Sequence, residues 1–111
     1  MTLLDKETME TTVMELIINA GESKSYAMEA LSAAKKNDWQ QVDICLKHST
    51  EASKRAHDVQ TQLIGLDEGE GKVPVNLIMV HAQDHIMTSM LARELIQEMI
   101  DMRKEMHAIA Q

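Results

Sequence analysis

The second half of the sequence contains a long segment without any helix-breaking residue. After Pro74, no proline or glycine occurs up to the last residue, Gln111. Proline is tolerated in the first turn of a helix, where its missing N–H would have no partner inside the helix. At about 100° per residue, the apolar side chains of this segment fall into two adjacent stripes. We therefore expect one long helix from about Pro74 to about Ala108.

These two stripes indicate how much of the expected helix is buried. The first contains Leu77, Val80, Asp84, Thr88, Leu91, Leu95 and Met102, and the second contains Ile78, Ala82, His85, Ala92, Ile96 and Met99. A helix that is apolar over so much of its circumference is buried on more than one side. The rest of one short chain can cover one side, and other copies of the chain could cover the other. The pattern thus favours an oligomer.

Asp84 lies within the first stripe, and His81 flanks it three residues earlier. Side chains at this spacing are neighbours on a helix. A carboxylate in a buried stripe is costly unless it is paired, protonated or bound to a cation. If three chains pack these helices in parallel about a threefold axis, three Asp84 carboxylates converge, and a hard divalent cation would neutralise them. The alternative is a single Asp84 paired with His81 or with a lysine of the same chain.

The first half of the sequence predicts two further helices and no strand. Helical spacing runs through residues 6–36, and Gly21 interrupts it in a way that marks either a kink or a close helix contact. Asp38, followed by Gln41, resembles the N-cap of a second helix with its capping-box partner. This second helix is expected to end near Gly65.

Because the links between the three expected helices are short, neighbouring helices should run antiparallel. The expected fold class is therefore all-α: an up-down-up three-helix bundle that forms a single domain over residues 1–111. The chain has no Phe and is 2% aromatic, so its core must consist of aliphatic residues and Met. Its ten Met supply adaptable side chains for that core or for a contact surface.

Charge and cysteine content limit the partners and the compartment. A net charge of −7 argues against nucleic acid and anionic membrane surfaces as partners, because both require clustered Lys and Arg. Cys45 is the only cysteine, so no internal disulfide can form, and a reducing cytosol fits. No apolar run is long enough to span a bilayer. We expect a cytoplasmic protein without direct membrane insertion.

His81 is the residue best suited to chemistry. A neutral imidazole nitrogen is a competent nucleophile at cytosolic pH, and histidine is a group that forms covalent intermediates. His57 could face the same cleft as His81. Spacing alone nevertheless favours an ordinary interface or core histidine at position 81.

His81 and His85 could also bind a metal together with Asp84. However, the residues between the two histidines include Gln83 and Asp84, and the glutamate-bearing zinc-protease pattern is absent. The sequence evidence for a zinc site is therefore weak.

Residues 80–89 resemble a known signature. Val-His-Ala-Gln-Asp-His at 80–85, followed by Ile-Met-Thr-Ser, is similar to the motif of the enzyme IIA component of the lactose/cellobiose/chitobiose class of the bacterial phosphotransferase system (PTS) for sugar uptake. Residues 87–95 are most similar to the chitobiose/cellobiose branch rather than to the lactose branch. Supporting similarities cover nearly the whole chain, at residues 17–21, 37–39, 56–61 and 69–72.

This resemblance implies a three-helix antiparallel bundle that assembles as a homotrimer. It implies that His81 accepts a phosphoryl group from the carrier protein HPr on its Nε2 (tele) nitrogen and passes it to the IIB component, for the coupled uptake and phosphorylation of a β-linked disaccharide of the chitobiose/cellobiose class. Asp84 would bind a divalent cation at the threefold axis, and Mg²⁺ is the expected ion. Gln83 and His85 receive supporting roles. Such a chain is a phosphotransferase component that acts only with HPr and IIB.

Two expectations concern the surroundings of His81. We expect it about two turns inside its helix, too far for that helix's own N-terminus to hold a phosphoryl group, so donors must come from an adjacent subunit or from the partner protein. The competing hypothesis is a non-catalytic, metal-stabilised helical scaffold in which Asp84 is structural and His81 is inert. Spacing alone favours the scaffold, and the motif favours the phosphoryl carrier.

Overall fold

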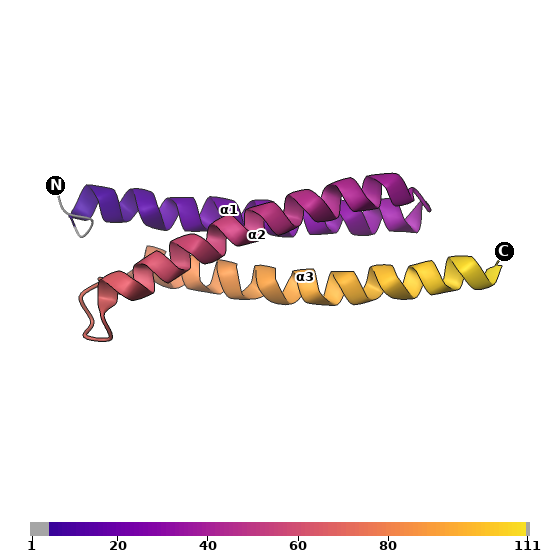
Figure 1. Cartoon of the computed structure of the whole chain (residues 1–111). Helices are drawn as coiled ribbons and strands as arrows, with labels where there is room; N and C mark the ends of the chain where they lie inside the picture. The colour runs from indigo at the N-terminus through magenta and orange to yellow at the C-terminus, as the bar shows by residue number, and fades with distance from the viewer. Residues whose placement is uncertain (1–4, 111) are drawn as a thin grey trace.

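The computed structural model describes residues 5–110 and consists of three long helices (Figure 1). Consecutive helices run antiparallel and form a rod of 59 × 21 × 20 Å, and no strand occurs among the described residues. The predicted all-α, up-down-up bundle is confirmed. Of the single domain predicted over residues 1–111, residues 1–4 and 111 lie outside the described part. The helices are α1 (Lys6–Lys35), α2 (Trp39–Asp67) and α3 (Leu77–Ala110).

The first two helices begin at aspartate caps. The Asp5 carboxylate accepts a hydrogen bond from the N–H of Thr8 at 2.9 Å, and the Asp38 carboxylate accepts one from the N–H of Gln41 at 3.2 Å. Each bond satisfies a backbone donor that the helix itself leaves unpaired. The predicted cap at Asp38 is confirmed. The capping box is only half formed, because the Gln41 side chain donates to the Cys45 Sγ at 3.4 Å instead of returning to the cap.

The third helix starts three residues later than predicted, at Leu77 instead of Pro74. Asn76 is its cap: the Asn76 side-chain oxygen accepts from the N–H of Met79 at 3.0 Å, and its carbonyl accepts from the N–H of Val80 at 3.0 Å. Asparagine is among the preferred N-caps. It defines the helix start more strongly than proline does, because proline is merely tolerated in a first turn and supplies no acceptor side chain.

A carboxylate at the end of α2 organises the link between α2 and α3. The Asp67 side chain accepts hydrogen bonds from the N–H of Gly71 at 3.2 Å and from the N–H of Val73 at 2.9 Å. Gly71 has a φ of 75°, a left-handed conformation that glycine adopts without steric cost. Val73 is buried in the apolar core. The link therefore guides the chain in a defined path to the cap of α3.

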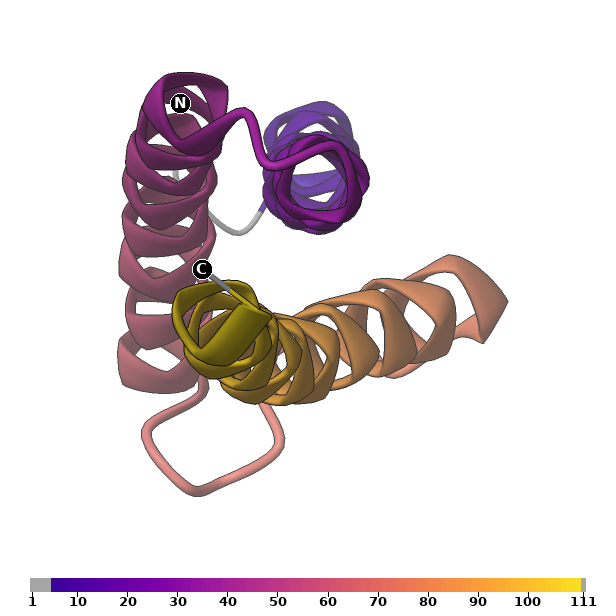
Figure 2. The same cartoon turned by 90° about the vertical axis from the view of Figure 1, so that its right-hand side faces the viewer.

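The central element of the bundle is α1. It packs along both other helices, whereas α2 and α3 approach each other closely over a short stretch and diverge toward the loop that joins them (Figure 2). Two apolar clusters hold the rod together, one around Leu16 near the loop end and one around Ile100 at the other end, and both of these side chains are fully buried. Removing apolar surface of this kind from water is the main stabilising contribution to the fold.

Buried serines connect the helices between the two clusters. The Ser49 hydroxyl donates to the Ser23 carbonyl at 2.8 Å, and the Ser89 hydroxyl donates to the Ala20 carbonyl at 2.9 Å. Gly21 lies beside these contacts in a helix that continues through it. A Cβ at Gly21 would meet no atom of the described chain within 4 Å, so the close contact predicted as one alternative does not exist within the chain.

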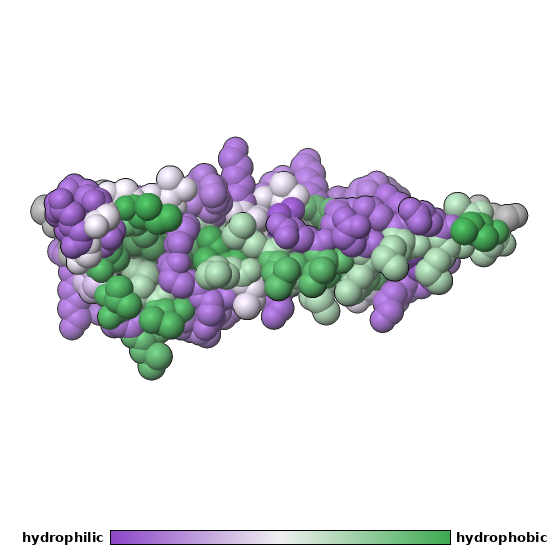
Figure 3. Space-filling view, turned by 90° about the horizontal axis from the view of Figure 1, so that it is seen from below, coloured by the Kyte–Doolittle hydropathy of each residue, from purple (hydrophilic) through white to green (hydrophobic). Residues whose placement is uncertain are grey.

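The two predicted stripes of α3 have different surroundings. The second stripe is only partly buried: Ala82 and Ile96 pack inside the bundle, whereas Ile78 and Met99 are exposed. The buried face of α3 also contains residues that neither stripe included: Met79, Ile86, Ser89 and Ile100. The first stripe lies uncovered on the outer face, and apolar side chains extend along much of the length of the rod in Figure 3. Among the described residues, no helix combines the length and apolar character required to cross a bilayer. The large apolar side chains exposed along α3 are Leu77, Ile78, Val80, Met87, Met90, Leu91, Leu95, Met99, Met102, Met106 and Ile109.

Candidate functional site

His81 lies one turn inside α3, on its exposed face. Because α3 begins at Leu77, His81 is the fifth residue of the helix, and the expectation of about two turns is wrong. The His81 side chain is 51% exposed. The N–H of Met79, in the first turn, already donates to the Asn76 side chain and is not free to bind an anion.

Two neighbours from the same helix flank the His81 ring. Its Nδ1 lies 3.6 Å from the Asp84 Oδ1. The His85 ring meets it edge-on, with centroids 4.6 Å apart and an angle of 82° between the planes. A carboxylate beside Nδ1 favours the tautomer with its proton on that nitrogen, which leaves the lone pair on Nε2. No described residue bonds to Nε2. The arrangement presents an accessible imidazole nucleophile and not a core histidine.

Gln83 makes the closest side-chain link from this part of α3 to another helix. The Gln60 Nε2 donates to the Gln83 Oε1 at 2.6 Å, and the Gln83 Nε2 donates back to the Gln60 Oε1 at 2.9 Å. Gln83 also donates weakly to the Met79 Sδ at 3.7 Å. Both glutamines are half-buried. This reciprocal amide pair joins α2 to α3 two residues from His81.

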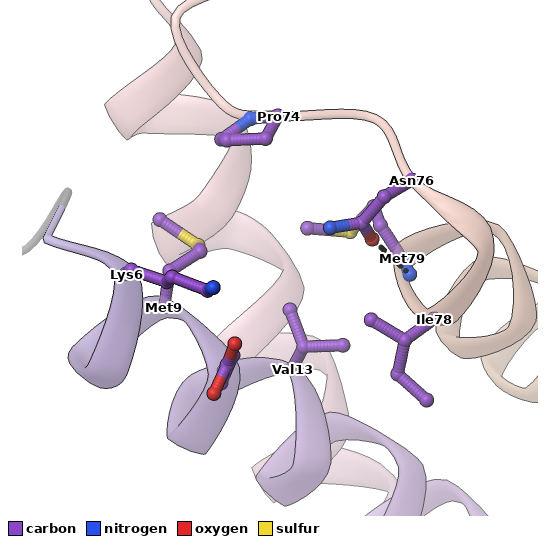
Figure 4. A pocket seen from close by; sticks show the side chains of 8 residues that line it. Lys6, Met9, Val13, Pro74, Asn76, Ile78 and Met79 are labelled. Carbon is purple, nitrogen blue, oxygen red and sulfur yellow. Dashed lines mark hydrogen bonds between the residues drawn. The ribbon is translucent and has the colours of Figure 1, made fainter.

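Hollows surround the first turns of α3. An open hollow of about 500 Å³ is lined by His81, Asp84 and the apolar side chains that precede them. A groove of about 370 Å³ lies between the end of α2 and the start of α3, and the Gln60–Gln83 pair forms part of its lining. A third hollow separates the starts of α1 and α3 (Figure 4). In this third hollow Lys6, Met9 and Val13 face Pro74, Asn76, Ile78 and Met79.

The described part of one chain does not form a complete metal site. The described residues contain no group of three or more His, Cys, Asp or Glu side chains placed to hold an ion. His81, His85 and Asp84 therefore do not form the three-ligand zinc site considered from their spacing. Asp84 is 62% exposed on the outer face of α3, and carboxylate oxygens are the ligands that Mg²⁺ and Ca²⁺ prefer. Its chemistry fits a hard cation whose further ligands come from outside the chain.

One predicted residue lies apart from His81, and one relevant residue was not singled out. His57 is exposed on α2, and no described hydrogen bond, ion pair or ring contact joins it to His81. Gln60 was noted only as part of a similar segment, and its bond to Gln83 spans 23 positions. The one local signal for Gln60 is its position directly after Val59, because Val59 lies on the inner face of α2 and Gln60 is polar.

Comparisons with known proteins converge on one family. The family model described as "PTS system, Lactose/Cellobiose specific IIA subunit" matches residues 11–104. The N,N'-diacetylchitobiose-specific EIIA component of Escherichia coli K12 is 49% identical over 107 residues, which cover 96% of this chain and 92% of that protein. The crystal structure of the PTS cellobiose-specific enzyme IIA from Bacillus anthracis superposes with a TM-score of 0.86 at 37% identity, covering 91% and 93% of the two chains.

A further solved structure is a complex. The IIA(Chitobiose)–HPr complex from the N,N'-diacetylchitobiose branch of the Escherichia coli phosphotransferase system matches with a TM-score of 0.77 at 48% identity. The match covers 89% of this chain and 96% of that one. In that structure, the chain similar to ours is bound to HPr.

Proposed function

This chain belongs to the lactose/cellobiose-specific IIA family of the phosphotransferase system, and from that premise we propose that His81 is its phosphoryl-carrying residue. HPr is the donor, the IIB component is the acceptor, and the Nε2 atom of His81 carries the group between them. The relatives named for chitobiose and cellobiose indicate the sugar class: a β-linked disaccharide, taken up and phosphorylated by the other components in a cytoplasmic relay.

The observation that carries this proposal is the orientation of the His81 ring. With Nδ1 3.6 Å from the Asp84 Oδ1, the carboxylate favours the tautomer protonated at Nδ1, and the Nε2 lone pair points away from that contact. In the forward step, Nε2 attacks the phosphorus of phospho-HPr, and the bond from phosphorus to HPr breaks as the new N–P bond forms. In the second step, a nucleophile on IIB attacks the same phosphorus, and Nε2 leaves with its electron pair. The Nδ1 proton stays in place throughout.

Positioning and charge stabilisation provide most of the catalysis in phosphoryl transfer. Among the described residues, His81 has two polar neighbours, Asp84 and His85, from its own helix. Asp84 stabilises positive charge on the imidazole as Nε2 bonds to phosphorus. His85 restricts the ring from one edge. Further donors to the phosphoryl oxygens are expected from the donor protein or a second copy of the chain.

Three copies of α3 assembled in parallel would cover the outer apolar stripe. The stripe extends from Leu77 to Met102 with polar residues at Asp84 and Thr88, and His81 flanks it. The three Asp84 carboxylates would then share a divalent cation, most simply Mg²⁺, whose contribution is to neutralise like charges. This assembly leaves His81 near the rim of the interface, where partner proteins can reach it.

Intact-protein mass spectrometry tests the proposal directly. The protein is incubated with phosphoenolpyruvate, enzyme I and HPr, and kept at neutral or alkaline pH because phosphohistidine is acid-labile. The parent protein should gain one phosphoryl group, and His81→Gln should gain none. His57→Gln is the matched control, since His57 is an exposed histidine on α2 that makes no described contact with His81. It should gain one group like the parent.

Two results would contradict the proposal. Phosphorylation of His81→Gln to the same extent as the parent would place the carrier residue elsewhere. No gain in any of the three proteins, with HPr shown to be phosphorylated, would favour the non-catalytic helical scaffold.

A further inference from the structure

The attachment of α3 near His81 differs from its attachment further along. Toward the loop, α2 and α3 diverge (Figure 2), and a groove of about 370 Å³ opens between them. The Gln60–Gln83 amide pair spans this divergence with bonds of 2.6 and 2.9 Å. The same part of α3 is also held by apolar contacts of Met79, Ala82 and Ile86, in a cluster to which both α1 and α2 contribute.

Among the described residues, no hydrogen bond, ion pair or ring contact joins the His81 ring to the other two helices. Its ion-pair and ring contacts are with Asp84 and His85, both on α3. The location of Nε2 relative to the rest of the protein therefore follows the rotation of α3 about its axis. Side chains extend about 5–6 Å from the axis of a helix, so a rotation of about 10° moves the ring by roughly 1 Å.

From these contacts we propose that Gln60 is a positioning residue for His81 and acts through Gln83. This inference rests on the proposed function of His81. The apolar contacts of this part of α3 are non-directional and allow a helix to rotate or slide slightly. The hydrogen bond from Ser89 to the Ala20 carbonyl of α1 lies eight residues beyond His81. Two reciprocal amide bonds are directional and weaken steeply when misaligned. The pair thus sets the rotation of α3 at the turn that carries His81, while Gln60 itself touches no reacting atom.

The effect on the reaction follows from the sensitivity of transfer to geometry. A displacement of about 1 Å can lower the rate of a positioned reaction by about a hundredfold. Because α1 still limits the movement of α3, we expect a loss of about tenfold when the amide pair is broken. The maximal transfer rate should decrease, and the phospho-HPr concentration that gives the half-maximal rate should stay the same. The reason is that the surface of the protein that binds HPr keeps its shape.

A double-mutant cycle provides the test. Gln60→Met and Gln83→Met each keep the side-chain length and remove the amide, and the double variant removes both. Single-turnover transfer from phospho-HPr is measured for each protein with its melting temperature. Gln60→Met should lower the maximal rate about tenfold in the parent and should have no further effect when Gln83 is already Met, because groups that act as one pair are non-additive.

A matched control breaks a different link between the same helices. Arg93 on α3 donates to the hydroxyls of Ser49, Ser53 and Thr50 on α2, at 3.0, 3.3 and 2.9 Å. It lies twelve residues after His81, about 18 Å along the helix. Arg93→Met should lower the melting temperature and leave the maximal transfer rate within twofold of the parent.

The outcomes separate a positioning role from a structural one. An equal slowing by Gln60→Met in both backgrounds would overturn the inference, and so would a lower melting temperature with an unchanged rate. Slowing by Arg93→Met of the same size would overturn it too, since any link between α2 and α3 would then suffice. A parent protein that takes no phosphoryl group would instead refute the proposed function, and this inference would fall with it.

Discussion

The two faces of α3 show how one helix can serve stability and chemistry separately. Its inner face packs on α1 with side chains such as Ile86 and Ile100, which are 4% and 0% exposed. Its outer face leaves Leu91 and Leu95 half-exposed and carries His81. The inner face therefore stabilises the single chain. The outer face stabilises nothing within the chain, which leaves it free, as we propose, to present a nucleophile and to bind further copies.

The largest effect is expected from a charged substitution on the outer face of α3. Leu95→Glu should abolish assembly, because a symmetric oligomer would bury one unpaired carboxylate from each copy. The single chain should keep its helices, since Leu95 is 50% exposed within it. Light scattering reports the mass and circular dichroism the helix content. Ile44→Glu, at an exposed apolar position on α2, is the control and should not change the mass. An unchanged mass for Leu95→Glu would show that the stripe is not an interface.

A truncation on the inner face should affect the chain itself. Ile100→Ala removes a fully buried side chain from the cluster between α1, α2 and α3. Loss of transfer free energy together with the remaining cavity should lower the free energy of unfolding by about 2–5 kcal/mol. Denaturant titration measures it. If the protein is an oligomer, the titration is repeated at several protein concentrations, and a loss that depends strongly on concentration would assign Ile100 to assembly and not to the core.

Asp84→Asn tests whether the outer face binds a cation. A cation that binds the folded assembly raises its stability by about 2.7 kcal/mol at a hundredfold excess over its Kd. The parent should therefore melt at a higher temperature with Mg²⁺ than with EDTA. The variant should show no such difference, because an amide does not supply the negative charge. Equal behaviour of parent and variant with Mg²⁺ would exclude Asp84 as a ligand.

Asn76→Ala probes the start of the helix that carries both faces. It removes the acceptor of the Met79 N–H and should cost about 1 kcal/mol, the usual contribution of an N-cap. Asn76→Asp keeps the acceptor and should restore most of the loss. Thermal unfolding gives the melting temperatures of the two variants, and equal values would show that the cap contributes little to stability.

The smallest expected change is a gain, on α1. Gly21→Ala places a methyl group in a helix interior where no described atom lies within 4 Å. It should stabilise the protein by about 0.4–1 kcal/mol, because alanine loses less conformational freedom on folding than glycine. A loss of stability would instead indicate that another copy of the chain packs against Gly21.

Several features were predictable because they are local. The Asp38 cap and the neighbouring positions of His81 and Asp84 lie within one helical turn, where backbone geometry alone sets the distance. The start of α3 was also local and was still assigned wrongly. The predicted start rested on Pro74 alone and did not consider Asn76, although only the asparagine side chain can accept the first-turn N–H.

Sequence periodicity by itself determined that the chain forms three helices, that α3 has an inner and an outer stripe, and that His81 lies beside Asp84. Only the tertiary structure decided that α1 is central, that the buried face of α3 follows Met79, Ile86 and Ile100 and not the first stripe, and that Gln60 meets Gln83 across 23 positions. The physical reason is that periodicity sets the direction of a side chain around its own helix. The rotation and axial offset of one packed helix against another come from the summed contacts of both surfaces, which no local spacing contains.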